Sequence, residues 1–298
     1  LERYTYDLEP LPFKSGSHVI TKYVYSRFGV GNCEKGVGVG PKGESYINFM
    51  YGWNEYFIAG FDCDGKVIEG NYLKDKIKPD VSKGAPAELD SAVVGPLPAA
   101  CGGVRVDLNG NIYVGMRLMS KDFKLATGYE KNLAYTTWTG CIAKFPKEGG
   151  TVLENKVEGA KGQRMHFMNR ETKIAGATKV YSGIGPFSGN EFGGGGSCCV
   201  CRIPRFDIDR YGRLCYTNGV TNSVTIIDNN GNLIKEFGSY GNFDTNNTSE
   251  TVQKDIITFA WPIGAGFTKD HIYTLDAYNR RIVQTNYLFD VEVVEPIK

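Results

Sequence analysis

Short apolar runs separated by polar turns recur along the chain, most regularly over residues 204–238. That stretch holds four such runs, at 206–209, 214–217, 224–228 and 233–237. Runs of this length, broken by Gly, Asn and Asp, are typical of an antiparallel meander. A single four-stranded sheet cannot bury both of its faces, so the pattern predicts neighbours of the same kind.

Three further stretches repeat this order of runs and turns. Together the repeats predict four-stranded units at about 36–72, 102–155, 204–238 and 261–296. Their first turns fall at Gly43, Gly110, Gly212 and Asp270, and their second turns at Gly65, Gly149, Gly231 and near Leu288. The fourth strands of the first two units are expected at 67–72 and 151–155. The chain is therefore expected to be all-β.

Two insertions, at about 120–138 and 156–200, interrupt the repeats. The first lies between the second and third strands of its unit, and long loops in such places often carry function. The second ends in a glycine tract that runs into clustered cysteines, NEFGGGGSCCVC. Neither half of it shows paired glycine turns, so we interpret it as an excursion and not as a further unit.

Three stretches carry the pattern PxGhxhDxxGNhYVxDxxNxRI, in which h is apolar: 101–114, 203–218 and 261–282. In these stretches the chain resembles the NHL repeats of β-propellers. The resemblance implies a single propeller domain over residues 1–298, with four blades visible and six expected in the complete fold. The remaining blades would lie within 1–34 and 156–200, or upstream of Leu1 in a longer chain.

The repeated turn residues have a structural interpretation. Glycine allows positive φ, and Asp or Asn side chains hold turns by hydrogen bonds to the backbone. Composition adds that the 38 glycines are about twice the average share, as a fold of many turns requires.

Charge and hydropathy argue against nucleic acid as a partner and against a membrane span. The 34 Lys and Arg residues balance 33 Asp and Glu, so no basic surface favours nucleic acid. Every uncharged apolar run is far too short to span a bilayer. We therefore predict neither nucleic-acid binding nor a membrane span.

Propellers bind ligands where the loops of all blades converge, so the corners after the second strands are the first candidates for a site. With one residue of the insertion at 120–138, the candidate rim residues are Tyr51, Trp53, Asn54, Arg117, Trp138, Asn218, Asn222, Asp276, Asn279 and Arg280. Aromatic rings beside amide and guanidinium donors suit a carbohydrate or a peptide. The alternative is that these are ordinary loop residues.

The cysteines form a second candidate cluster: Cys198, Cys199, Cys201 and Cys215. Three interpretations stay open. Disulfides could anchor the glycine-rich segment to its blade, which would imply an oxidising compartment. A zinc-thiolate site is the second, although CCxC lacks both CxxC spacing and a second pair. Buried thiols that act as small apolar side chains are the third.

Catalytic motifs are not evident. His18, His166 and His271 fall at unrelated places in the repeat, and the sequence lacks GxSxG, HExxH and P-loop motifs. No cofactor is evident; calcium stays open because its oxygen ligands need no fixed spacing. The sequence favours a non-catalytic, extracytoplasmic module that binds another protein, another part of a larger chain, a carbohydrate or a peptide. The alternative is a propeller hydrolase or lyase with calcium or zinc in the central channel.

Overall fold

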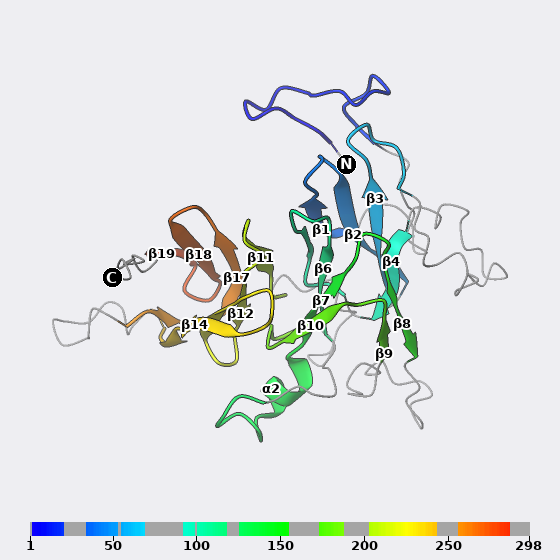
Figure 1. The fold of residues 1–298 in the computed structure, drawn as a ribbon. Helices are drawn as coiled ribbons and strands as arrows, with labels where there is room; N and C mark the ends of the chain where they lie inside the picture. Colours follow the sequence, from blue (N-terminus) through cyan, green and yellow to red (C-terminus); the bar gives the residue numbers. More distant parts are fainter. Residues whose placement is uncertain are drawn as a thin grey trace, which may run out of the picture.

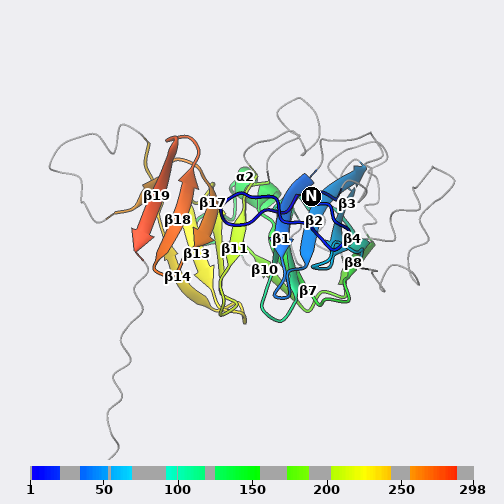
Figure 2. The ribbon, with the colours of Figure 1, turned by 90° about the horizontal axis from the view of Figure 1, so that it is seen from above.

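The chain forms a β-propeller, as the sequence predicts. The computed structural model describes residues 2–20, 34–52, 55–68, 92–98, 100–117, 125–154, 173–187, 203–242 and 256–286. Antiparallel blades stand side by side in chain order, from blade 1 (blue) to blade 4 (orange to red) (Figures 1 and 2). In these ranges no helix is both long and apolar enough to cross a membrane.

Blade 1 consists of β1 (Glu34–Val39), β2 (Ser45–Gly52), β3 (Glu55–Phe61) and β4 (Ala92–Pro98). The sequence predicts its fourth strand at 67–72, and the strand that pairs along β3 is instead β4. Within the described part of that run, Val67 makes a single bridge to Phe61, and residues 69–72 lie outside the described ranges. Burial gives the reason, because Val94 and Leu97 are almost fully buried and Val67 is exposed. The later, more apolar run supplies the outer strand.

Blade 2 consists of β5 (Val104–Val106), β6 (Ile112–Met116), β7 (Cys141–Phe145) and β10 (Lys179–Ser182). The sequence pattern predicts its outer strand at 151–155 and an excursion over 156–200. Instead, β10 is the outer strand, and β8 (Thr151–Glu154) pairs with β9 (Lys173–Ala175) in a separate two-stranded sheet.

The chain leaves blade 2 after β7 because two glycines let it approach blade 1. The Gly95 N–H donates to the Gly150 carbonyl at 2.8 Å. Gly149 has φ of 87°, and a Cβ there would lie 1.7 Å from the Val93 carbonyl oxygen. Only glycine fits this crossing, which places β8 beside β4 (Figure 1).

Blade 3 holds the four strands that the sequence predicts within 204–238: β11 (Phe206–Ile208), β12 (Leu214–Asn218), β13 (Ser223–Ile227) and β14 (Leu233–Phe237). Blade 4 is described as β17 (Pro262–Phe267), β18 (His271–Asp276) and β19 (Arg281–Asn286). Its expected fourth strand, 291–296, lies outside the described residues. Between these blades, β15 (Ser239–Tyr240) pairs in parallel with β16 (Thr258–Phe259).

The turns confirm the structural interpretation of the repeated Asp and Gly residues. Four aspartates each accept backbone N–H groups from the residues two and four positions later, at 2.8–2.9 Å: Asp62, Asp107, Asp209 and Asp228. The glycine three positions after each has φ of 79–85°. The repeat thus specifies a five-residue turn. Its Asp carboxylate accepts hydrogen bonds from two backbone N–H groups that have no partner strand in the turn.

Apolar packing joins each blade to the next. One core cluster spans blades 1, 2 and 3 and includes Tyr56, Tyr113 and Phe206. A second cluster lies between blades 3 and 4 and includes Cys215 and Ile272. The blades therefore pack face to face, which holds their corner loops together at one end.

Candidate functional site

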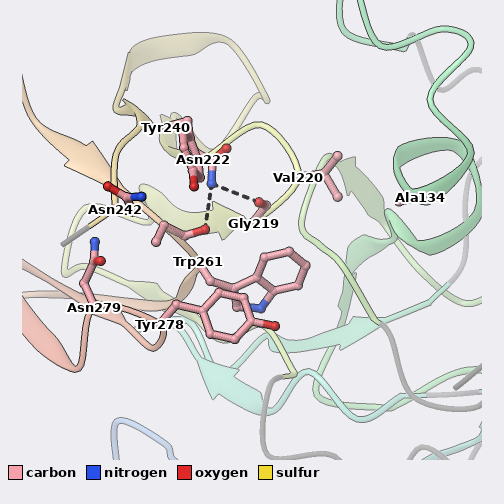
Figure 3. A pocket seen from close by; sticks show the side chains of 10 residues that line it. Ala134, Gly219, Val220, Asn222, Tyr240, Asn242, Trp261, Tyr278 and Asn279 are labelled. Atoms are coloured by element: carbon pink, nitrogen blue, oxygen red, sulfur yellow. Dashed lines mark hydrogen bonds between the residues drawn. The ribbon is translucent and has the colours of Figure 1, made fainter. Parts of the chain in front are cut away.

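A pocket of about 570 Å³ opens where the corner loops of blades 3 and 4 meet the insertion of blade 2 (Figure 3). The insertion contributes the short helix α2 (Leu133–Trp138), which the Asn132 side chain caps. The lining residues carry no formal charge: Ala134, Gly219, Val220, Asn222, Tyr240, Asn242, Ala260, Trp261, Tyr278 and Asn279. The pocket is therefore lined by aromatic rings, amides and small apolar groups.

Asn222 forms the blade 3 side of the pocket. Its φ is 53°, in the left-handed region that Asn tolerates better than most residues. The Nδ2 group donates to the carbonyls of Gly219, at 3.2 Å, and Ala260, at 3.0 Å (Figure 3). This amide therefore fixes its own corner and ties it to the segment that enters blade 4.

Asp276 anchors the blade 4 side from behind. Its carboxylate is fully buried and accepts the backbone N–H of Trp261 at 2.9 Å and that of Ala260 at 3.2 Å. The Nδ2 group of Asn279 donates to it at 2.6 Å, and Arg281 Nε lies 3.3 Å away. A buried carboxylate needs such compensation, and here the compensation holds the pocket wall in place.

Asn279 extends this network to the loop after blade 3. Its Nδ2 group also donates to the Gly241 carbonyl at 2.9 Å. That contact keeps Tyr240 and Asn242, which flank Gly241, at the pocket edge. Next to Asn279, Arg280 is exposed and has φ of 50°, so it turns the chain at the corner.

Two aromatic rings form the floor. The Trp261 and Tyr278 ring centroids are 5.4 Å apart at an interplanar angle of 49°. Tyr278 is 50% exposed, and Tyr240 on the opposite side is 66% exposed (Figure 3). The indole Nε1 of Trp261 is buried and has no acceptor among the residues described. The Nδ2 groups of Asn222 and Asn279 are taken up by backbone and carboxylate acceptors. The pocket thus offers exposed ring surface next to side-chain amides, whose oxygens can accept hydrogen bonds.

Five of the predicted rim residues lie in or near the pocket. Asn222 and Asn279 line the pocket, and Asp276 and Arg280 belong to the same corner. Asn218 lies at the neighbouring junction of blades 2 and 3, where its Nδ2 donates to the Gly183 carbonyl at 2.8 Å. The side chains of Asn218, Asn222, Asp276 and Asn279 hydrogen-bond mainly to backbone groups.

Of the other predicted rim residues, Arg117 and Trp138 do not line the pocket. Arg117 is buried just after β6, and the Trp138 carbonyl, at the end of α2, accepts the Phe187 N–H at 2.7 Å. Tyr51 lies in β2, but its side chain, like Trp53 and Asn54, falls outside the described residues.

Sequence reasoning missed Trp261, Tyr240 and Asn242. They lie in the segment that leads into the inner strand of blade 4, whereas the sequence analysis sought candidates at the corners after the second strands. In a four-stranded meander, the segment that enters the first strand and the corner after the second strand lie at the same end of the sheet. The Trp that opens the stretch WPIGAGF therefore marks a candidate residue for the same site.

Cys215 is fully buried between blades 3 and 4, and burial raises the pKa of its thiol. Cys63, Cys101, Cys141 and Cys215 are all thiols in the structure. For Cys215 this agrees with the buried-thiol interpretation, and the structure gives no support to a disulfide there. Cys198, Cys199 and Cys201 lie outside the described residues.

Within the described ranges, no group of three or more His, Cys, Asp and Glu side chains is placed to hold a metal ion. His18 lies against the Tyr4 ring, with centroids 5.6 Å apart, and His271 begins β18 beside Tyr273. These two histidines belong to separate parts of the molecule.

No protein-family model and no curated protein matches the sequence. The chain is weakly similar to a large number of solved structures, among them the following three. A protein of unknown function from Bacteroides caccae has a TM-score of 0.32 and 11% identity, over 85% of this chain and 60% of that one. A virginiamycin B lyase from Staphylococcus aureus with quinupristin has 0.34 and 14%, over 87% and 71%. Regucalcin, a calcium-binding protein from Agrobacterium tumefaciens, has 0.35 and 11%, over 81% and 52%.

The lyase and regucalcin are β-propeller proteins. The chain spans only 60% and 52% of the Bacteroides caccae protein and regucalcin. At these TM-scores the similarity identifies no family. The propeller architecture is seen in the chain's own blades, and the NHL family remains a resemblance of sequence.

Proposed function

We propose that the chain is a non-catalytic propeller module that binds a neutral carbohydrate in the pocket between the corners of blades 3 and 4. The observation that carries the proposal is the lining, in which partly exposed rings lie next to amides without a formal charge. Apolar C–H faces of a sugar ring stack on aromatic surfaces, and amides supply hydrogen bonds for its hydroxyl groups.

The shape of the pocket supports a small ligand. Its volume of about 570 Å³ falls in the range of small-molecule sites, roughly 300–1,000 Å³. Its walls are held by side chain to backbone hydrogen bonds from Asn222, Asn279 and Asp276. A pocket built in this way is formed before the ligand arrives, which lowers the entropic cost of binding.

The acid–base groups of the site support binding over hydrolysis. Glycoside hydrolysis uses two carboxyl groups that face the scissile bond. At this pocket the neighbouring carboxylate, Asp276, is fully buried behind the wall and accepts hydrogen bonds from two backbone N–H groups and from Asn279. We therefore propose retention of the sugar without bond cleavage, in the extracytoplasmic setting that the sequence suggests.

Calorimetric titration with maltose, cellobiose and lactose tests the proposal. We expect saturable one-to-one binding of at least one sugar, and a loss of about tenfold or more in affinity for Tyr278→Ala. Tyr211→Ala is the matched control, since Tyr211 is 60% exposed in a turn at the opposite end of blade 3. Failure of all three sugars to bind, or equal affinity of the two variants, would overturn the carbohydrate proposal.

The alternative from the sequence is a hydrolase or lyase with calcium or zinc in the central channel. Metal analysis of the dialysed protein separates the two functions. One equivalent of calcium or zinc retained after dialysis, together with sugar cleavage that a chelator stops, would replace the binding module by the enzyme.

A further inference from the structure

The outer face of blade 4, the side turned away from blade 3, carries three exposed apolar side chains. Tyr273, Leu275 and Ile282 are 38%, 43% and 68% exposed. Leu275 and Ile282 are direct cross-strand partners in β18 and β19. The residues that alternate with them in β18, such as Ile272, are buried against blade 3.

The same positions are fully buried in blade 3. The first residues of β18 and β12 that pair with the inner strand are Ile272 and Leu214, which sets the two blades in register. In that register the exposed pair Leu275–Ile282 corresponds to Thr217–Val224, which is also a cross-strand pair.

Thr217 and Val224 are both 0% exposed, on the face of blade 3 that blade 4 covers. Tyr273 corresponds in turn to Cys215, which is likewise fully buried there. The exposed residues on the outer face of blade 4 therefore occupy positions that are buried between blades in blade 3, but no described sheet covers this face.

This outer face is also uncharged. Gln284 and Asn286 continue it along β19, and half-buried His271 lies at its edge beside Tyr273. The exposed strand β14, by contrast, carries Lys235 and Glu236. Because no like charges oppose each other, the outer face of blade 4 is compatible with an identical face.

We propose that the outer face of blade 4 is an interface of the interblade type, and that in this chain the same face of a second copy covers it. A two-fold axis would place Tyr273, Leu275 and Ile282 of each copy against those of the other, an isologous contact. The packing continues what is seen between blades 3 and 4, where two sheets bury apolar faces against each other.

Sedimentation velocity from about 1 to about 100 µM tests this interface. We expect a concentration-dependent dimer that Ile282→Lys converts to a monomer with an unchanged far-ultraviolet circular dichroism spectrum. Leu233→Lys is the matched control, since Leu233 is 63% exposed on β14, and it should leave the dimer intact. Leu275→Glu is a second variant, which should also be monomeric.

A wild-type chain that stays monomeric over this range, or a dimer that persists in both Ile282→Lys and Leu275→Glu, would overturn the proposal. A different polypeptide as the occupant of this face would give the first of these results. The interface is independent of the sugar site: Tyr278→Ala should still dimerise, and the monomeric variants should still bind sugar.

Discussion

Arg105 Nε lies 2.9 Å from Asp207 Oδ1, and this ion pair joins the inner strands of blades 2 and 3 at the centre of the propeller. Arg105 Nη1 also donates to the Val37 carbonyl in β1 at 3.4 Å, and Asp207 Oδ2 accepts the Phe267 N–H of β17 at 3.1 Å. One pair of side chains thus connects all four described blades.

Each of the flanking blades has a glycine at the position equivalent to the members of this pair. Arg105 and Asp207 are the penultimate residues of their inner strands, and the equivalent residues of blades 1 and 4 are Gly38 and Gly266. A Cβ at Gly38 would lie 3.2 Å from the Val104 carbonyl oxygen. A Cβ at Gly266 would lie 3.5 Å from Asp207 Oδ2. The centre therefore combines two charged side chains with two glycines.

Breaking the central pair should destabilise the propeller. Arg105→Met and Asp207→Asn should each lower the free energy of unfolding by about 1–2 kcal/mol, because the remaining charge loses its partner in a partly buried position. Urea unfolding of both variants and of the double variant gives the coupling energy, expected at about 1 kcal/mol. Purely additive losses would show that the two side chains act independently.

Gly149 and Gly110 offer a matched pair of glycine substitutions. Both have positive φ, but a Cβ at Gly110 meets nothing within 4 Å, whereas one at Gly149 would overlap the Val93 carbonyl. Gly110→Ala should cost about 1 kcal/mol of stability, from backbone strain alone. Gly149→Ala should cost more than about 3 kcal/mol, since β8 must move away from β4. Equal unfolding midpoints would contradict this account of the crossing.

Substitutions of Asp276 and Tyr278 distinguish a residue that supports the pocket wall from one that contacts the ligand. Asp276→Ala removes the acceptor of two backbone N–H groups and leaves Arg281 without this carboxylate, so it should lower the free energy of unfolding by about 3 kcal/mol and weaken sugar binding as well. Tyr278→Ala should weaken binding with little loss of stability. Thermal unfolding and titration of both variants check the split. A stable Asp276→Ala protein that binds normally would show that the carboxylate does not hold the wall.

The regular parts of the fold could be predicted from the sequence because they are local. In blade 3, four strands and their turns follow without interruption, so residues 204–238 alone specify the sheet. The outer strands of blades 1 and 2 could not be predicted in the same way. The runs 67–72 and 151–155 also have strand-like patterns. Burial against distant segments selects 92–98 as the outer strand of blade 1. In blade 2 the close approach of Gly149 to Val93 takes the chain to blade 1, and 179–182 becomes the outer strand.

The site was half predictable for the same reason. Asn222 and Asn279 stand at repeated corners, so the repeat marks them. Trp261 and Tyr240 come from the connection between two blades, and their approach to Asn222 depends on how the blades pack.

Alkaline pH should weaken the contact between blades 2 and 3. Burial raises the pKa of Tyr181 to about 12, and burial and the Asp107 carboxylate raise the pKa of Tyr113. In the unfolded chain a tyrosine has a pKa near 10. Above about pH 10 the unfolded state therefore loses its protons first, and the free energy of unfolding falls up to the folded pKa of each tyrosine.

Urea unfolding at several values from about pH 8 to about pH 11.5 measures this loss. Tyr181→Phe should show a shallower decline than the wild type, although it starts lower because the hydroxyl no longer donates to the Asn229 carbonyl. Parallel curves for the two proteins would contradict the assignment.

Thiol labelling tests the state of the cysteines. In the native protein, iodoacetamide should modify exposed Cys63 and leave buried Cys215 unmodified. Burial keeps the reagent away from Cys215, and its raised thiol pKa reduces the fraction of reactive thiolate. Denaturation without reductant should expose Cys215 to labelling. Mass spectrometry of the peptides checks this, and a Cys215 that labels only after reduction would show that it forms a disulfide.

Fluorine NMR of protein labelled with 5-fluorotryptophan tests the carbohydrate site most directly. The chain has three tryptophans, and Trp261→Phe identifies the resonance of the indole in the pocket. Addition of a sugar that binds in the titrations should shift the Trp261 resonance more than those of Trp53 and Trp138, and Tyr278→Ala should abolish the shift at the same sugar concentration. A Trp261 resonance that stays in place at saturating sugar would contradict binding in this pocket.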